Sequence, residues 1–390
     1  MKTRSLSFLM AAAIFTMLGC SKNETRGPKL VQEPLTPHTN SGTVAYLDTA
    51  VTNFFKRTSG SIAFDGAFSV PLSSGKVAWL TNDTYFNDYN STTKTVPCNL
   101  FNDHNTVMMQ PASHSWSPSL TTTLTASGQP NVPNGSPALF WDLNINNYIW
   151  PGAGVEIGTT VYAWANEITN VTNGFKVVGD YLASFNESNS QVNYINPPNL
   201  DTINFGVGMV KVTTGGNNYI YVYGYKPVPS GLGSNIYVAR FLQSTPSSWA
   251  FWDGTTSTWV SSSASATSIG LAASNGCYVA FVNSKYVLLS TAFTLACDEG
   301  TAIYASTSTS PTGPFNTMQV IYNITDKLNG HTPYYYTPVI HTEFTANSEF
   351  LFTYCINGYE PCVANCSGST MDPNIYRPRG VRVPFSVLGL

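Results

Sequence analysis

Five hairpin-like blocks recur along this chain, and they restrict its fold more than any other feature of the sequence. In each block an apolar strand and a second, aromatic-rich strand flank a short turn, and Gly, Asn, Asp, Ser or Pro separates one block from the next. Helical periodicity is scarce after the N-terminal segment. The blocks span residues 63–85, 148–165, 205–241, 269–315 and 334–357.

The spacing of these blocks predicts an all-β fold, a five-bladed β-propeller. They lie roughly 50 to 80 residues apart, which suits propeller blades better than the closer, more even strand spacing of a sandwich. In a propeller the innermost strands of all blades face one axis, so residues far apart in sequence can meet there. We expect a single propeller domain over residues 42–390.

The composition indicates an exported protein and excludes a nucleic-acid partner. Charged residues make up only 10% of the chain, against about 25% in ordinary soluble proteins. The net charge is −3 and no basic cluster occurs, whereas phosphate binding needs a dense basic surface. Aromatic residues reach 13%, which favours strands and supplies flat faces for sugar rings.

The N-terminus is typical of a lipoprotein signal. Lys2 and Arg4 precede an apolar run over residues 6–18 that is too short to cross a bilayer. The run ends in Met17-Leu18-Gly19-Cys20, which resembles a bacterial lipobox. We therefore expect residues 1–20 to be a signal ending in a lipidated Cys20, and residues 21–41 to be a flexible tether.

This reading places the chain in the bacterial cell envelope, at the outer membrane or in the periplasm. The membrane would be contacted only through the lipid anchor, and the protein is expected to be a monomer. Ordinary secretion with an incidental cysteine is the alternative.

Six cysteines remain after Cys20, and an even number in an exported chain favours disulfides. From their positions in predicted hairpins and loops, the pairing expected is Cys277 with Cys297, Cys362 with Cys366, and Cys98 with Cys355. Zinc is the rival interpretation, but no Cys-x-x-Cys occurs. The pairing is one of several that six cysteines allow.

Residues 64–84 place two carboxylates, Asp65 and Asp83, at opposite ends of one predicted hairpin. Asp is a poor strand residue and is costly to desolvate, so an Asp at the end of an apolar run needs a reason. Turn capping is one reason. The other is an acid pair, if both ends of the hairpin reach one pocket.

The chain resembles a family of bacterial surface and secreted five-bladed propellers of largely unknown function, some members of which are endo-D-arabinanases. The resemblance covers about residues 41–390. Segments of four blades carry it: Asp65-Gly66 with residues 69–72, Trp79 and 82–84; residues 150–154 with Val161-Tyr162; residues 303–306 with 310–315; and residues 341–343, 353–354, 357–358 and 376–379. Asn82, Thr342 and Thr353 differ from the family pattern.

The resemblance implies a glycoside hydrolase, because hydrolysis of a glycosidic bond uses one protonated and one ionised carboxyl group. By similarity to five-bladed glycosidases, Asp65 is expected to be the base or nucleophile. Asp83 would be the nucleophile or would tune the pKa of a neighbour. Glu343, beside His341 in a nearly uncharged strand, is expected to be the general acid.

Seven further residues are expected to bind the carbohydrate: His104, Asn105, Trp150, His341, Asn357, Arg377 and Arg379. The alternative for His104 is a role in stabilising its loop, and for Trp150 it is burial in the core. For the two arginines the alternative is closure of the propeller by pairing with an acid on the first blade. No metal site or cofactor is predicted, although a structural calcium could occupy the axial channel.

The function expected is therefore an envelope-anchored glycoside hydrolase that acts on a polysaccharide, possible substrates including arabinans. A non-catalytic glycan-binding surface lipoprotein would need the same aromatic platforms and the same Asn and Asp side chains. A scaffold or adhesion propeller would instead have a closed axis and a large apolar patch elsewhere.

Overall fold

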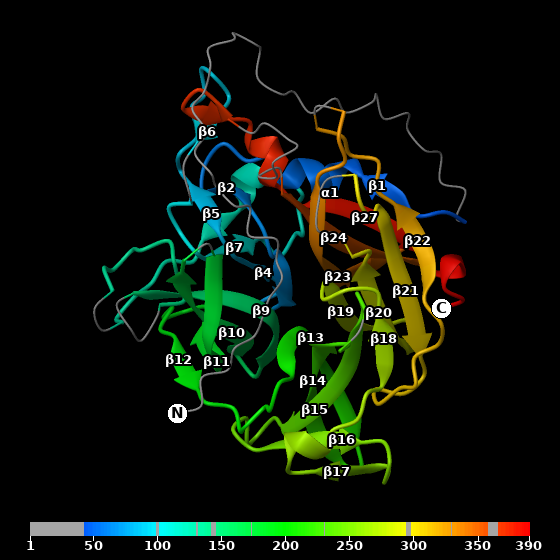
Figure 1. The fold of residues 1–390 in the computed structure, drawn as a ribbon. Helices are drawn as coiled ribbons and strands as arrows, with labels where there is room; N and C mark the ends of the chain where they lie inside the picture. Colours follow the sequence, from blue (N-terminus) through cyan, green and yellow to red (C-terminus); the bar gives the residue numbers. More distant parts are fainter. Residues whose placement is uncertain are drawn as a thin grey trace.

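Five antiparallel sheets follow one another along the chain and stand in a ring (Figure 1), which confirms the five-bladed β-propeller. The computed structural model describes residues 43–98, 101–129, 132–141, 146–172, 174–229, 231–293, 298–328, 330–357 and 366–390. The predicted signal, Cys20 and the tether lie outside the described residues.

The first two blades come from residues 68–195. Blade 1 contains β3 (Phe68–Pro71), β4 (Val77–Thr81), β7 (Thr106–Gln110) and β8 (Thr122–Thr123). Blade 2 contains β9 (Asn147–Ile157), β10 (Thr160–Val171), β11 (Gly174–Asn186) and β12 (Asn193–Ile195).

The next two blades have the same plan. Blade 3 contains β13 (Asn204–Thr214), β14 (Asn217–Pro227), β15 (Ser234–Leu242), β16 (Trp249–Asp253) and β17 (Thr258–Val260), with β18 (Gly270–Ala272) beside β15. Blade 4 contains β19 (Cys277–Val282), β20 (Lys285–Thr291), β21 (Ala302–Ser308) and β22 (Gln319–Asn323).

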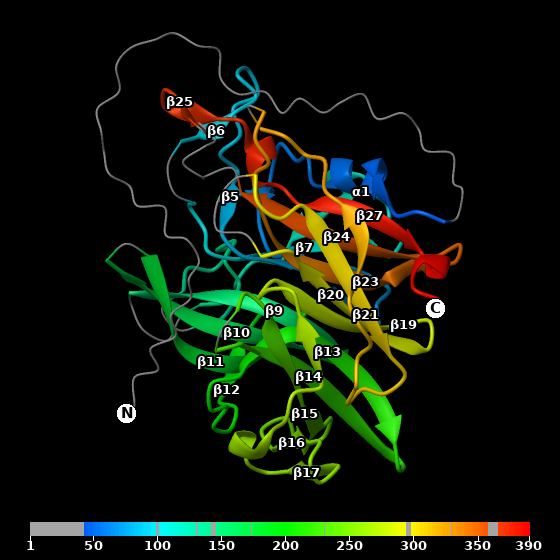
Figure 2. The same ribbon diagram turned by 45° about the vertical axis from the view of Figure 1, so that its right-hand side comes forward.

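Blade 5 joins the two ends of the described chain. It contains β23 (Tyr334–Ala346), β24 (Glu349–Asn357), β27 (Arg379–Pro384) and β1 (Tyr46–Asp48), in this order. The outermost strand β1 pairs with β27, and Asp48 accepts a 2.9 Å hydrogen bond from Nε of Arg382. The N-terminal strand thus completes the sheet that the C-terminal strands begin, and it closes the ring (Figure 2).

The innermost strands of the blades define the axis. β3 lies against β9, β9 against β13, β13 against β19, β19 against β23, and β23 against β3. All five strands begin at the same face of the ring. The residues at their starts, and those just before them, therefore lie close together on that face. The side chains there decide the chemistry of the axis.

Smaller elements pack against blades 1 and 5. The helix α1 (Thr49–Phe54) begins at Asp48, whose carboxylate accepts hydrogen bonds from the N–H groups of Ala50 and Val51. β2 (Ser61–Phe64) pairs with β5 (Thr84–Phe86), and β6 (Val96–Pro97) joins β25 (Cys366–Ser367) and β26 (Thr370–Met371). None of the helices in the described part of the chain is long and apolar enough to span a bilayer.

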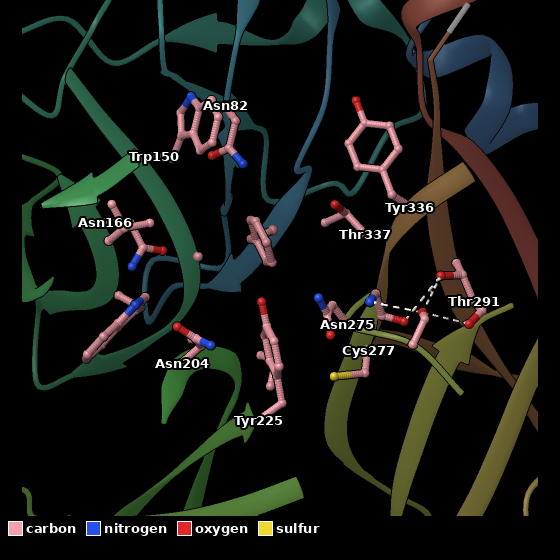
Figure 3. A pocket seen from close by; sticks show the side chains of 18 of the residues that line it. Asn82, Trp150, Asn166, Asn204, Tyr225, Asn275, Cys277, Thr291, Tyr336 and Thr337 are labelled. Carbon is pink, nitrogen blue, oxygen red and sulfur yellow. Dashed lines mark hydrogen bonds between the residues drawn. The ribbon is translucent and has the colours of Figure 1, made fainter. Parts of the chain in front are cut away.

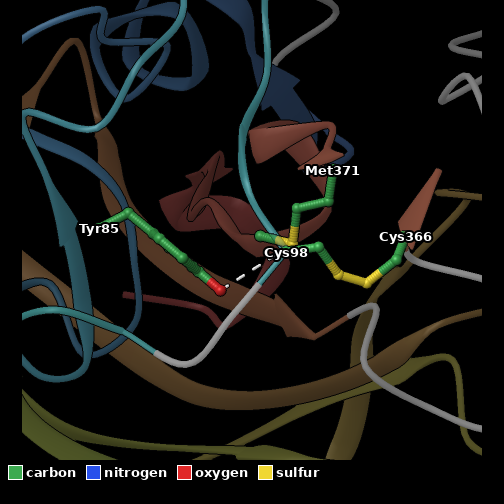
Figure 4. The surroundings of a disulfide bond; sticks show 4 residues. All are labelled: Tyr85, Cys98, Cys366 and Met371. Carbon is green, nitrogen blue, oxygen red and sulfur yellow. Dashed lines mark hydrogen bonds between the residues drawn. A yellow bond between two sulfur atoms is a disulfide. The ribbon is translucent and has the colours of Figure 1, made fainter. Parts of the chain in front are cut away.

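A disulfide joins Cys98 to Cys366 across 268 residues, and their Cα atoms are 5.7 Å apart (Figure 4). This corrects the predicted pairing: Cys277 and Cys355 are buried free thiols, and Cys366 is not bonded to Cys362. Cys297 and Cys362 lie outside the described residues. Sequence position failed here because the three-stranded sheet of β6, β26 and β25 brings together segments from opposite ends of the chain.

Removal of this disulfide is expected to destabilise the fold. The double variant Cys98→Ser/Cys366→Ser should lose about 2–5 kcal/mol of unfolding free energy, because the unfolded chain regains the freedom that the long closed loop removes. Urea unfolding followed by tryptophan fluorescence measures the loss. The reductant dithiothreitol should lower the midpoint of the wild type and leave that of the variant unchanged; a wild type insensitive to reductant would contradict the prediction.

Candidate active site

A cavity of about 210 Å³ opens where the inner strands begin, and all five blades contribute to its wall (Figure 3). Its labelled side chains come from blade 1 (Asn82), blade 2 (Trp150, Asn166), blade 3 (Asn204, Tyr225), blade 4 (Cys277, Thr291) and blade 5 (Tyr336, Thr337), with Asn275 just before blade 4. The propeller thus places residues distant in sequence around one space, as the strand pattern predicted.

Asp65 and Asp83 lie near each other beside this cavity. They are the residues next to the Phe64–Thr84 pair that ends the short β2–β5 ladder. The charge of Asp83 acts on the pKa of Asp65, which shows that the two carboxyl groups are close. The backbone N–H of Asn82, a residue of the cavity wall, donates to the carbonyl oxygen of Asp65 at 3.0 Å. The predicted hairpin therefore does bring its two acidic ends together.

The Asp65 carboxyl is held by two tyrosines of distant segments. Its Oδ2 accepts hydrogen bonds from Tyr336 at 2.7 Å and from Tyr376 at 2.9 Å. Its Oδ1 is buried and has no hydrogen-bond partner among the described residues. Burial, and secondly the nearby charge of Asp83, raise the pKa of Asp65 to about 7, while the two phenols oppose this rise. Asp65 can therefore hold a proton near neutral pH.

Asp83 has a different environment. Its Oδ1 accepts from Nδ1 of His104 at 2.7 Å and from Nε1 of Trp150 at 3.0 Å. The His104 ring stacks on Tyr148 with centroids 3.7 Å apart, which fixes its direction toward Asp83. Two N–H donors on one oxygen stabilise a carboxylate. The pair thus combines a carboxyl that retains its proton with one whose negative charge is supported.

Replacing Asp83 with Asn should lower the pKa of Asp65, because a like charge is removed while burial stays. A pH titration of ¹³C-labelled Asp carboxyls by NMR measures this. Since the folded pKa of about 7 exceeds the ordinary Asp value of 3.8, the native chain binds this proton more strongly, so the contribution of Asp65 to stability falls as the pH rises between these values. The variant Asp253→Asn, at a partly exposed residue of blade 3, is the control, and an unchanged Asp65 titration in the Asp83 variant would refute the coupling.

Residues 48–385 match the family described as "Domain of unknown function (DUF5005)". The chain belongs to this family. No curated protein matches the sequence. The DUF5005 match covers every blade strand except the first two residues of β1.

Among solved structures, the DUF5005 chain is similar to a protein of Bacteroides ovatus ATCC 8483 described as a "putative hydrolase", with a TM-score of 0.64 and 18% identity over 91% of this chain and 93% of that one. This likeness shows a shared fold. An endo-arabinase of Bacteroides thetaiotaomicron VPI-5482 gives a TM-score of 0.41 and 9% identity over 84% of this chain and 97% of that one. A GH43_1 enzyme of Xanthomonas citri gives 0.40 and 13% over 85% and 92%. These two scores are too low to carry an inference.

In this DUF5005 protein Glu343 lies in β23 and is hydrogen-bonded to Ser69, near the start of β3. Burial raises the pKa of Glu343 to about 7, opposed by the hydrogen bond from Ser69. The raised pKa expected of a general acid is therefore present, and the role of Glu343 as the acid stays a prediction.

Two residues predicted to bind substrate are instead held inside the protein. His341 is fully buried between Ser69, 2.7 Å from its Nδ1, and Thr353, 2.9 Å from its Nε2, and burial lowers its pKa to about 3. Asn105 is 1% exposed and bonds the backbone of Phe140 through both ends of its amide. These side chains cannot reach a sugar because their polar atoms are already taken, so the substrate-binding prediction for them is corrected.

The two arginines are also structural. Arg377 donates to the carbonyl oxygens of Ile62 and Arg57, and Arg379 donates to those of Arg377 and Asn374. Both are at least 96% buried. The alternative given for them was pairing with an acid of the first blade; Arg379 does pair with an acid, but with Asp326, between blades 4 and 5, at 3.5 Å. Asn357 ends β24 opposite Tyr334, a residue of the cavity wall, and its role in binding stays a prediction.

His104 and Trp150 are the predicted binding residues that lie at the site. Sequence reasoning missed Tyr336 and Tyr376, although Tyr376 was part of the motif at residues 376–379. They lie 271 and 311 residues from Asp65, so no local pattern connects them. In the described residues no group of three or more His, Cys, Asp or Glu side chains is arranged to hold a metal ion, and the calcium suggestion stays untested.

Proposed function

We propose that this protein hydrolyses glycosidic bonds of a polysaccharide, with Asp65 as general acid and Asp83 as its ionised partner. The observation that carries the proposal is the acid pair itself: two neighbouring carboxyl groups, in environments that differ in the way acid–base catalysis requires, beside a cavity on the propeller axis. The resemblance implied that Asp65 is the base or nucleophile. We assign it the role of general acid instead, because burial raises its pKa and so favours its protonated form.

In this mechanism Asp65 donates its proton to the glycosidic oxygen, and the bond between that oxygen and the anomeric carbon breaks. The Asp83 carboxylate attacks the anomeric carbon or takes a proton from the water that does so. Retaining enzymes have carboxyl groups about 5–5.5 Å apart and inverting enzymes have them farther apart. The configuration of the released sugar therefore distinguishes direct attack by Asp83 from attack by water.

The cavity wall supports a carbohydrate substrate. Aromatic rings stack on sugar faces, and the wall contains Trp150, Phe175 and Tyr225. Amide side chains bond hydroxyl groups, and the wall contains four Asn residues. The resemblance to endo-D-arabinanase relatives makes furanosidic linkages such as those of arabinans the first substrates to test, with endo-action as one mode.

The test is a screen of purified mature protein on arabinans and on other plant and microbial glycans, with reducing ends and released oligosaccharides measured. The proposal expects wild-type product release from at least one glycan and none from the Asp65→Asn/Asp83→Asn double variant. A protein that binds a glycan in affinity electrophoresis but releases no product from it would instead be the non-catalytic binding lipoprotein.

We also propose that the chain is anchored to the cell envelope through a lipid on Cys20. The support is the charge order, the short apolar run and the lipobox-like Met17-Leu18-Gly19-Cys20. A disulfide between distant segments is consistent with folding in an oxidising compartment. An anchored propeller would present its axial cavity to polysaccharide outside the inner membrane.

A further inference from the structure

The axial cavity has a wall without any charged side chain. Of the residues that line it, none is Lys, Arg, His, Asp or Glu. Carboxyl groups hydrogen-bond to three residues of this wall: Asp65 to Tyr336, Asp83 to Trp150 and Asp180 to Asn166. An anionic ligand would therefore meet the negative potential of the ionised carboxylates behind the wall, which is unfavourable in a partly desolvated site.

The same wall contains three buried polar atoms that have no hydrogen-bond partner among the described residues: Oδ1 of Asn82, Nε1 of Trp164 and Nδ2 of Asn204. They come from blades 1, 2 and 3. An unpaired buried donor or acceptor is unfavourable because it loses its hydrogen bonds to water, so a native structure that keeps several at one place calls for an explanation. A ligand that supplies the missing partners is such an explanation.

The three atoms offer one acceptor and two donors. A sugar hydroxyl both donates and accepts, so neighbouring hydroxyls of one ring can satisfy such a set. The cavity of about 210 Å³ is smaller than the roughly 300 Å³ at which drug-sized pockets begin, so it suits one sugar ring with the rest of the chain outside.

We propose that the axial cavity is a subsite for one uncharged sugar ring, whose hydroxyls are bound by Asn82, Trp164 and Asn204, and that it excludes uronic acid residues. This rests on the proposed function, since it names the class of substrate for that site. Specificity arises from two sources: the polar atoms that are left unpaired without hydroxyls, and the ionised Asp83 behind the wall, which repels a sugar carboxylate.

The test measures binding without turnover, by saturation-transfer NMR and calorimetry on the full mature chain carrying Asp65→Asn. The probes are arabinotriose, xylotriose, galactotriose and trigalacturonate. At least one neutral trisaccharide should bind, and trigalacturonate should not. Trp164→Phe and Asn204→Ala should each weaken binding of the neutral probe about 3- to 10-fold, which corresponds to one hydrogen bond.

Trp249→Phe is the matched control. Trp249 packs 5.9 Å from Trp164, but its Nε1 already donates to the carbonyl oxygen of Pro246, so its loss should leave affinity unchanged. A second variant adds a function: Val177→Arg places a cation on the cavity wall and should allow trigalacturonate to bind.

The outcomes separate the inference from the proposed function. If trigalacturonate binds the unmodified wall as tightly as the best neutral probe, or if Trp164→Phe and Asn204→Ala bind like the parent, the inference is overturned even when the wild type hydrolyses a glycan. If neutral probes bind as expected but the wild type hydrolyses none of the glycans in the screen, the proposed function fails and the subsite remains. Binding of none of the probes overturns the inference.

Discussion

The variant Asp65→Asn is expected to lower glycoside hydrolysis by about 10²- to 10⁴-fold, the usual contribution of a general acid. Asn has nearly the shape of Asp and keeps an oxygen that can accept from Tyr336 and Tyr376. It cannot give a proton to the leaving oxygen. The loss should therefore fall on kcat, measured as reducing ends released from the glycan that the wild type cleaves, while substrate affinity changes little.

Two variants control this experiment. Asp253→Asn removes a partly exposed carboxyl at the end of β16 in blade 3 and should leave the rate unchanged. Tyr336→Phe removes one hydrogen bond that supports the ionised form of Asp65, so the alkaline limb of the pH–rate profile should move to higher pH. Equal product release by wild type and Asp65→Asn would exclude Asp65 as the acid, provided both have the same circular dichroism spectrum.

The second large effect concerns the propeller axis, where Gly208→Ala should destabilise the fold by on the order of 4 kcal/mol. Gly208 is in β13, the inner strand of blade 3, and has a φ of +147° that L residues rarely adopt. A Cβ atom there would lie 2.2 Å from the carbonyl oxygen of Val279 in β19. Because the obstacle is backbone, a rotamer change cannot relieve the clash, and blades 3 and 4 would have to separate.

Gly216→Ala is the matched control, since Gly216 also has a positive φ, +74°, but nothing lies within 4 Å of its Cβ position. It should cost about 1 kcal/mol, from backbone conformation alone. The unfolding free energies of the two variants are measured by chemical denaturation. Their difference gives the cost of the steric clash between the blades, because both variants share the cost of a positive φ. Equal midpoints for Gly208→Ala and Gly216→Ala would show that the inner strands do not need this contact.

The sequence contained enough information for the fold and for half of the site. Alternating strands and turn residues are local properties, so the hairpin blocks predicted five blades, and all five are present. The Asp65–Asp83 pair was also accessible, because both ends of one hairpin are related by local register. His104 and Trp150 follow in the same and the next blade, and both lie at Asp83.

The rest depended on how the blades close into a ring. Whether His341 or Arg377 faces a sugar or a backbone carbonyl is decided by which blade packs against it, and a strand pattern does not specify that neighbour. The same holds for Cys98 and Cys366, and for the tyrosines that meet Asp65 from the far end of the chain. Local hydrogen bonding and alternation fix a strand and its hairpin partner, so the sequence determined the blades. Burial, desolvation and the distances between acids arise only when all five inner strands meet at one axis, so the tertiary structure decided which of the predicted acids share a site.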